Sequence, residues 1–184
     1  MLAATAAALS VSARMTGGWD FRIVNSARDG RELVRMLEPL VWGVEGPEGP
    51  TFIVVPRMFE TDFASIPRIV RGRYPAMGPW ARAALPHDFG YMTRGTQDAA
   101  LCFCTNRAGE RVPMFTEAEM EAHRQLVQDL GGPWPQMTRK MVDDAFLQAM
   151  EVIAGERSDA EPGRFTRAKL HRAVRAFGAG GWGR

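Results

Sequence analysis

The residue pattern changes character once along the chain, after Pro67, and this change limits the possible folds more than any other feature. Before it, runs rich in Val, Ile, Phe and Trp are separated by Gly and Pro clusters such as ARDG and EGPEGP, which is typical of short antiparallel strands joined by turns. After it, apolar residues recur three and four positions apart, as in amphipathic helices. Strands followed by helices predict an α+β fold, with a small N-terminal antiparallel β-sheet packed on a C-terminal helical bundle.

The chain is long enough for one hydrophobic core, with 184 residues of which 46% are hydrophobic. We expect residues 18–184 to form a single α+β domain and residues 1–17 to be an N-terminal arm or an over-long start. No Lys or Arg precedes the apolar run at the start, so a signal peptide is not expected. No stretch has the length of a transmembrane segment.

Charge and cysteine content narrow the function classes. Six Lys or Arg residues and no acids lie between Arg164 and Arg184. A basic helix there is able to contact nucleic acid or anionic lipid, but a solvated helix face is the commoner reason for such residues. Cys102 and Cys104 form a C-x-C pair that suits neither a disulfide nor a zinc site, so we interpret both as small apolar strand residues.

His87 and Asp88 stand side by side in the apolar run AALPHDFGYM, where charged side chains are costly to bury without partners. On a helical wheel, His87 and Tyr91 share a face with Trp80, within an arc of about 60°, and Asp88 lies beside it. Pro86 predicts a kink, or a new helix that begins there and leaves His87 and Asp88 in its first turn. Asp88 would then lie near the positive end of the helix dipole.

A second acidic pair, Asp143 and Asp144, lies in the helical run VDDAFLQAM. Asp143 falls at the edge of the predicted core stripe, whereas Asp144 falls on the outer face. A buried carboxylate that faces an imidazole fixes its tautomer, which is the role of the orienting group in a general-base pair. The predicted core stripe consists of Val142, Ala145, Phe146, Ala149 and Ile153.

Asp62 in ETDFASIPR stands where the predicted sheet ends and the helices begin, a suitable place for a carboxylate ligand on a loop. Ser65 is explained as a helix N-cap before Pro67. A triad of Ser65, His87 and Asp143 lacks the G-x-S-x-G elbow. The plainer alternatives are a hydrogen-bonded core histidine and a loop-capping Asp62. No role is assigned to His123 or His171.

The motifs TDFASIPR, HD at 87–88, DDAFLQAM and HRAVRAFGAGGW together resemble a family of phage and prophage proteins known as domain of unknown function 1353. The resemblance covers most of residues 20–182. Its pattern places an aspartate three positions before a Phe, which corresponds to Asp143 and Phe146. Two features depart from it, namely Pro86 and a predicted hairpin and helix at about residues 96–135 that we interpret as an insertion.

The shorter motif HDFGY is similar to the active-site helix of the bacterial and fungal secreted phospholipases A2. This likeness implies that His87 is the base that activates water, that Asp88 and Asp62 bind Ca²⁺, and that Asp143 orients His87 with Tyr91 bonded to Asp143. Hard oxygen ligands suit Ca²⁺. If the metal were Zn²⁺, His87 would be a ligand and not a base.

These observations support two functions from different classes. The first is a phage-encoded, metal-dependent hydrolase, most concretely a phospholipase-like esterase acting on a lipid or cell-envelope substrate. The second is a non-catalytic virion component, at the tail or baseplate, in which the His-Asp-Asp set is a buried structural network among other phage structural proteins. Nucleic-acid binding by the basic C-terminal helix is a weaker third reading. The expected location is the virion or the host cytoplasm.

Overall fold

The computed structural model describes most of the chain from Met15 onward. Nothing is described of the segment that holds Ser65 and Pro67, so the predicted helix cap and the Ser65 triad lie outside the described residues. The described residues are 15–16, 20–25, 32–44, 51–63, 78–106, 108–156 and 163–182.

The N-terminal half folds into antiparallel strands, as predicted, but these form two three-stranded sheets in place of one, with the orders β1-β4-β5 and β2-β3-β6. The run ELVRMLEPLVWGV supplies two strands, because it breaks at residues 37–39. β1 lies in the segment that we expected to be an arm, and it pairs with β4. The strands are β1 Met15–Thr16, β2 Phe21–Asn25, β3 Glu32–Met36, β4 Leu40–Val44, β5 Thr51–Val55 and β6 Glu60–Thr61.

The C-terminal half is mainly helical, which confirms the α+β class. Four α-helices lie among the described residues of this half, together with two 3₁₀ turns and a short hairpin. Thr116 begins α4 with a capping box, in which its hydroxyl accepts from the Glu119 backbone and the Glu119 carboxylate accepts from the Thr116 backbone. The elements are α3 Ala81–Met92, η1 Ala99–Leu101, β7 Phe103–Thr105, β8 Arg111–Pro113, α4 Glu117–Asp129, α5 Arg139–Glu156, α6 Arg164–Phe177 and η2 Gly178–Gly181.

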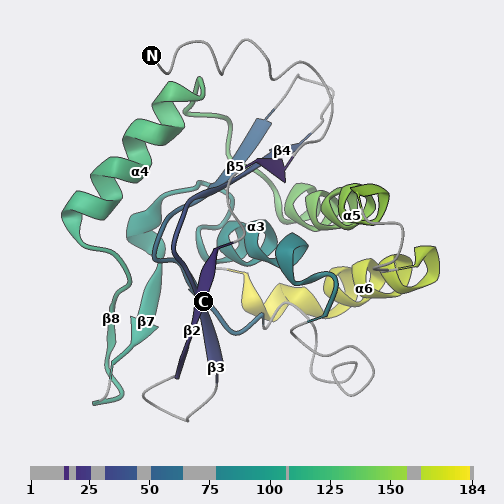
Figure 1. The fold of residues 1–184 in the computed structure, drawn as a ribbon, viewed down its shortest axis with the longest axis horizontal. Helices are drawn as coiled ribbons and strands as arrows, with labels where there is room; N and C mark the ends of the chain where they lie inside the picture. The colour runs from purple at the N-terminus through teal and green to yellow at the C-terminus, as the bar shows by residue number, and fades with distance from the viewer. Residues whose placement is uncertain are drawn as a thin grey trace.

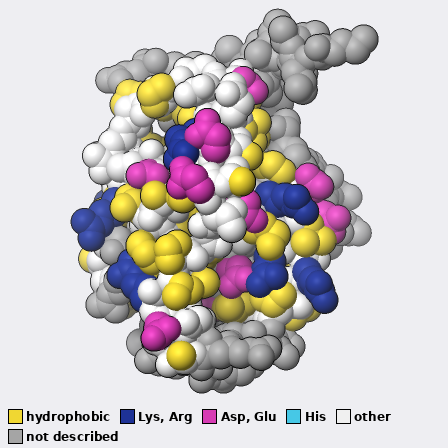
Figure 2. Space-filling view, turned by 90° about the vertical axis from the view of Figure 1, so that its left-hand side faces the viewer, with side chains coloured by type: hydrophobic (Ala, Val, Ile, Leu, Met, Phe, Trp, Pro, Cys, Tyr) yellow, Lys and Arg dark blue, Asp and Glu magenta, His cyan; other side chains and the backbone are white. Residues whose placement is uncertain are grey.

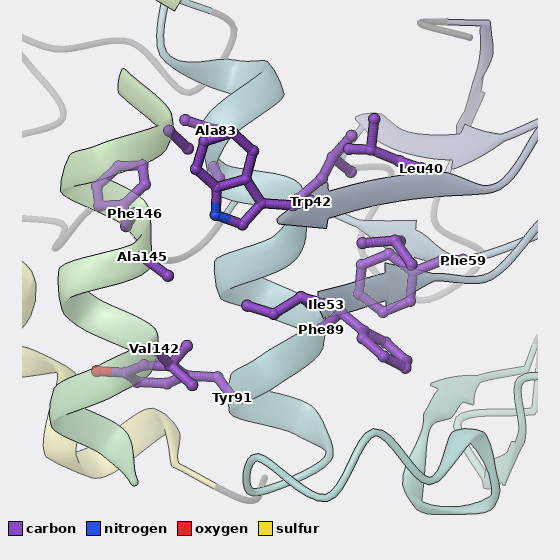
Figure 3. Packing of buried hydrophobic residues seen from close by; sticks show 14 of the residues in the cluster. Leu40, Trp42, Ile53, Phe59, Ala83, Phe89, Tyr91, Val142, Ala145 and Phe146 are labelled. Carbon is purple, nitrogen blue, oxygen red and sulfur yellow. The ribbon is translucent and has the colours of Figure 1, made fainter. Parts of the chain in front are cut away.

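Helix α3 lies at the centre of the molecule, between the strands and the pair α5 and α6, while α4 lies on the opposite side (Figure 1). Trp42 of β4 and Ile53 of β5 point toward α3, and Phe146 of α5 closes the core from the other side (Figure 3). Each of these three side chains is fully buried. The predicted stripe of α5 is buried along its whole length, so the helical period identified this core face correctly.

Pro86 does not begin a new helix. α3 runs continuously from Ala81 to Met92 with Pro86 inside it, so His87 and Asp88 lie in the middle of a helix and the expected position of Asp88 near the positive helix end is wrong. Burial explains why this helix tolerates a proline: eight other residues of α3 are buried, and their packing offsets one lost hydrogen bond.

The segment expected to be an insertion folds onto the outer edge of β5. Strands β7 and β8 form the predicted hairpin, and the turn is closed by the Asn106 N–H donating to the Glu110 carbonyl at 2.9 Å. Gln97 extends the edge of β5, because its Oε1 accepts from the Val54 N–H at 2.9 Å and its Nε2 donates to the Phe52 carbonyl. Cys102 and Cys104 are free thiols; Cys104 lies in β7, as expected, whereas Cys102 directly precedes this strand.

The surface on the side of α4 and the β7–β8 hairpin mixes apolar, basic and acidic side chains (Figure 2). Figure 2 shows Lys and Arg interspersed with Asp, Glu and apolar side chains there. None of the helices in the described ranges has the length and apolar character needed to cross a bilayer.

Gly95 lies three residues after the end of α3 and has φ of 75°, a conformation that other residues adopt at a cost. A Cβ there would overlap the carbonyl oxygen of Met137, and the Gly95 carbonyl accepts from the Met137 N–H at 3.0 Å. We expect Gly95→Ala to lower the free energy of unfolding by about 2 kcal/mol or more, measured by urea denaturation. Gly155→Ala is the matched control in α5, where a Cβ meets nothing, and it should be neutral or stabilising by about 0.5 kcal/mol. Equal effects of the two substitutions would contradict this account.

Candidate active site

His87 and Asp143 form a buried pair between helices α3 and α5. The His87 Nε2 lies 3.0 Å from the Asp143 Oδ1, and the two residues are 1% and 0% exposed. An ionised carboxylate only accepts hydrogen bonds, so His87 donates to Asp143 through Nε2. Close helix packing makes the pair possible, because Gly90 lets α3 approach Val142: a Cβ at Gly90 would lie 2.8 Å from that side chain.

Asp143 has further donors on both carboxylate oxygens. Tyr91 of α3 donates its hydroxyl to Oδ1 at 2.6 Å, beside the His87 bond. Arg175 of α6 donates to Oδ2 at 3.1 Å, and the Arg139 guanidinium lies 3.7 Å from the same oxygen. The ring of His87 stacks at a tilt on Tyr91, with centroids 4.2 Å apart. The carboxylate therefore accepts hydrogen bonds on both of its oxygens.

The other edge of His87 faces Asp88. The His87 Nδ1 lies 3.7 Å from the Asp88 Oδ1, and the Asp88 Oδ2 accepts a short hydrogen bond from the hydroxyl of Thr61 on β6. The Thr61 oxygen in turn accepts from the Phe63 N–H at 3.0 Å. Phe63 is buried and has φ of 52°, a left-handed conformation that costs a non-glycine residue about 1 kcal/mol or more. The strained turn fixes the loop that carries Asp62.

The surroundings shift the pKa values of His87 and Asp143 in opposite directions. Burial lowers the pKa of His87, but its hydrogen bond to Asp143 and its interactions with the carboxylates of Asp88 and Asp143 outweigh burial, so the pKa is raised. Burial raises the pKa of Asp143, but the hydrogen bonds from His87, Tyr91 and Arg175 outweigh it, so this pKa is lowered. Burial and the neighbouring carboxylate raise the pKa of Tyr91, which therefore stays a hydrogen-bond donor.

The surroundings of Asp88 differ from those of Asp143, because they disfavour the ionised carboxylate. Burial raises the pKa of Asp88, and the nearby charge of Asp62 raises it further against the opposing effects of His87 and Thr61. Two carboxylates and a hydroxyl oxygen are the donors that a hard cation prefers, and a cation would relieve their repulsion. Within the described ranges, no group of three or more His, Cys, Asp or Glu side chains forms a metal site. Backbone carbonyls and water would have to complete the coordination.

The structure brings the predicted residues His87, Asp88, Tyr91 and Asp143 together. Asp62 is near enough to Asp88 to influence its ionisation. Two contributors were missed by sequence reasoning, Thr61 and Arg175. Each lies inside a motif of the family resemblance, and this motif was the one sequence feature that pointed to it. The number of residues between each of them and its partner follows no helical or strand repeat.

The outward position predicted for Asp144 is confirmed. Its side chain is 35% exposed and it pairs with Lys140 at 2.5 Å. His171 of α6, which received no role, lies 3.0 Å from Asp144. His123 is buried, and its Nε2 contacts the Gln97 carbonyl at 3.0 Å.

Replacing Asp143 should destabilise the fold in a pH-dependent way. Asp143→Asn leaves His87 and Arg175 without their anion, and we expect a loss of about 3 kcal/mol near neutral pH. Because the pKa of Asp143 is lowered by folding, its contribution is present above the ordinary carboxyl pKa and is lost as pH falls through the folded value. The difference between wild type and variant should therefore shrink on acidification, measured by urea unfolding from about pH 7 to about pH 3.

Asp144→Asn is the matched control for this measurement. It makes the same chemical change one position along α5, but the side chain is partly exposed, so the expected loss is below about 1 kcal/mol. A similar loss in both variants, or a difference for Asp143→Asn that does not change with pH, would contradict a buried ionised Asp143.

Comparison with known proteins identifies a family but no activity. A family model described as "Protein of unknown function (DUF1353)" matches residues 35–161, more than half of the chain. No curated protein and no solved structure matches. The matched range contains Thr61, His87, Asp88 and Asp143, whereas Arg175 lies beyond it. The chain belongs to the DUF1353 family.

Proposed function

We propose that the protein is a metal-dependent hydrolase, most concretely a phospholipase-like esterase with His87 as general base. The observation that carries this proposal is the orientation of His87: its Nε2 is bound to the buried, ionised Asp143, and its Nδ1 faces the Asp88 side. An imidazole whose far nitrogen is held by a carboxylate is the usual form of a histidine that takes a proton from water.

In this mechanism, His87 accepts a proton from water at Nδ1. Asp143 stabilises the imidazolium that results, and Tyr91 and Arg175 keep the carboxylate in place. The raised pKa of Tyr91 means that its hydroxyl remains a donor and does not compete as a base. The activated water then attacks an ester carbonyl, and His87 returns its proton to the leaving alcohol.

Asp62 and Asp88 are the residues that would hold a cation, with the oxygen of Thr61 beside them. Ca²⁺ suits these donors, and Zn²⁺ is the alternative. A cation bound there would polarise the substrate carbonyl and stabilise the oxyanion that develops on it.

The substrate class and location follow from the resemblances alone. The likeness of HDFGY to secreted phospholipases A2 supports a lipid or cell-envelope ester. The resemblance to phage and prophage proteins supports a phage-encoded protein located in the virion or the host cytoplasm.

A second candidate function is supported by burial. His87 is 1% exposed and Asp143 is fully buried, as in a network whose role is to fix one packing arrangement. In this case the protein is a non-catalytic virion component, of the tail or baseplate, which contacts other phage structural proteins. The two candidates share the geometry but differ in what must reach His87: an enzyme has to admit water and substrate to the Nδ1 edge.

Metal binding tests the shared carboxylate site. Metal-stripped protein titrated with Ca²⁺, and separately with Zn²⁺, should bind one ion by calorimetry, and binding should be lost in Asp62→Asn and in Asp88→Asn because each removes a charged ligand. Asp129→Asn is the control, since Asp129 is an exposed acid of α4 that accepts a hydrogen bond from Gln125. Absence of binding in wild type, or unchanged binding in both site variants, would remove the metal from the proposal.

Ester hydrolysis separates the two candidates. With phospholipid vesicles and a fluorogenic short-chain ester as substrates, His87→Gln should reduce turnover by about 10²-fold or more, the usual effect of losing a general base. His123→Gln is the control, because it replaces another buried histidine, away from this site. Wild type that hydrolyses neither substrate with either metal, and that co-purifies with virions, would favour the structural candidate.

A further inference from the structure

Helix α6 contributes a charged group to the site from outside the matched family range. That range ends at residue 161, and α6 begins at Arg164. From its last turn, Arg175 reaches across to α5 and donates to the Asp143 Oδ2 at 3.1 Å. The Arg175 side chain is 34% exposed, whereas the carboxylate that it contacts is fully buried. The guanidinium therefore extends from the surface to a buried anion.

The division of donors between the two carboxylate oxygens gives Arg175 a distinct role. Oδ1 accepts from His87 and Tyr91, and both of these residues belong to α3. Arg175 is the partner of Oδ2 at hydrogen-bond distance, since the Arg139 guanidinium lies 3.7 Å away. With donors only on Oδ1, the carboxylate would be free to rotate about its bond to Cβ. A donor on Oδ2 fixes the plane of the group and thereby the direction in which the His87 Nε2–H points.

Arg175 is itself held in place by its surroundings. Its backbone carbonyl accepts from the Arg139 guanidinium at 3.2 Å, which ties the last turn of α6 to the first turn of α5. Three positions further on, Gly178 packs so closely on Tyr91 that a Cβ there would overlap the tyrosine hydroxyl. The ring of Trp182 meets Tyr91 edge to face, with centroids 5.1 Å apart. The C-terminal segment is thus built against the same Tyr91–Asp143 pair that Arg175 contacts.

We propose that Arg175 is a positioning residue, which locks the Asp143 carboxylate so that His87 is held as the Nε2–H tautomer. The importance of Arg175 for catalysis rests on the proposed function, but its effect on the position of Asp143 does not depend on any reaction. Arg175 acts through its contact with Asp143.

The test is the tautomeric state of His87, observed in the full-length protein by ¹⁵N NMR of labelled histidine. The chain has three histidines, so His123→Gln and His171→Gln variants assign the signals. The spectra are recorded at alkaline pH, where a neutral ring shows directly which nitrogen carries the proton. Wild type should show a single Nε2–H tautomer with a slowly exchanging proton, because this proton is buried and donated to Asp143.

Arg175→Gln should convert this signal to a mixture of tautomers and remove the slowly exchanging proton, while the His123 signal stays unchanged. Arg175→Lys should restore part of the wild-type pattern, since it keeps the charge but not the guanidinium geometry. Arg172→Gln is the matched control: it removes the same charge from an exposed position of the same helix and should leave the His87 signal as in wild type.

A wild-type His87 signal in Arg175→Gln would overturn the proposal, as would an equal loss in Arg172→Gln. If Arg175→Gln also loses the His123 signal, the variant is unfolded. The test then rests on Arg175→Lys, provided that it has wild-type stability: an unchanged His87 tautomer in this variant would overturn the proposal, and a partial mixture would support it. Because the measurement uses neither metal nor substrate, a positive result stands even if no hydrolysis is found. Conversely, hydrolysis that depends on His87 but not on Arg175 would refute the positioning role alone.

Discussion

The fold of the C-terminal half depends on one buried anion, the carboxylate of Asp143. A carboxylate without solvent exposure is strongly disfavoured unless donors surround it, and removing one partner leaves an uncompensated charge. Its hydrogen-bond donors come from α3 and α6, through His87, Tyr91 and Arg175, and the Arg139 guanidinium of its own helix lies 3.7 Å away. The relative positions of three helices are therefore specified by one side chain, in addition to the apolar contacts that pack them together.

The sheet half reaches this centre through Thr61. β6 is a short strand at the end of the β2-β3-β6 sheet, and Thr61 connects it to Asp88 in the middle of α3. The left-handed Phe63 directly after it shows that the chain accepts local strain to keep this connection, and burial of the Phe63 ring holds the strained residue in place. His87 thus lies between two acidic groups that different parts of the fold position independently.

Sequence analysis predicted the residue positions that follow the helical repeat, and it missed the contacts that follow no repeat. The 3.6-residue repeat placed Asp143 inward and Asp144 outward on α5, and it placed His87 and Tyr91 on one face of α3; the structure confirms each of these positions. The proline rule failed at Pro86, because tertiary burial of α3 overrides a local penalty. Contacts between distant segments, such as Arg175 with Asp143, depend on how helices pack, and no local pattern encodes them.

Burial and charge act differently on the two sides of His87. On the Asp143 side, the hydrogen bonds from His87, Tyr91 and Arg175 and the charge of His87 oppose burial, and the pKa of Asp143 is lowered. On the Asp88 side, the charge of Asp62 adds to burial in disfavouring the ionised form of Asp88, against the opposing effects of His87 and Thr61. A cation shared by Asp88 and Asp62 would reverse this effect because it attracts both charges, so the proposed metal site is consistent with the electrostatics of Asp88.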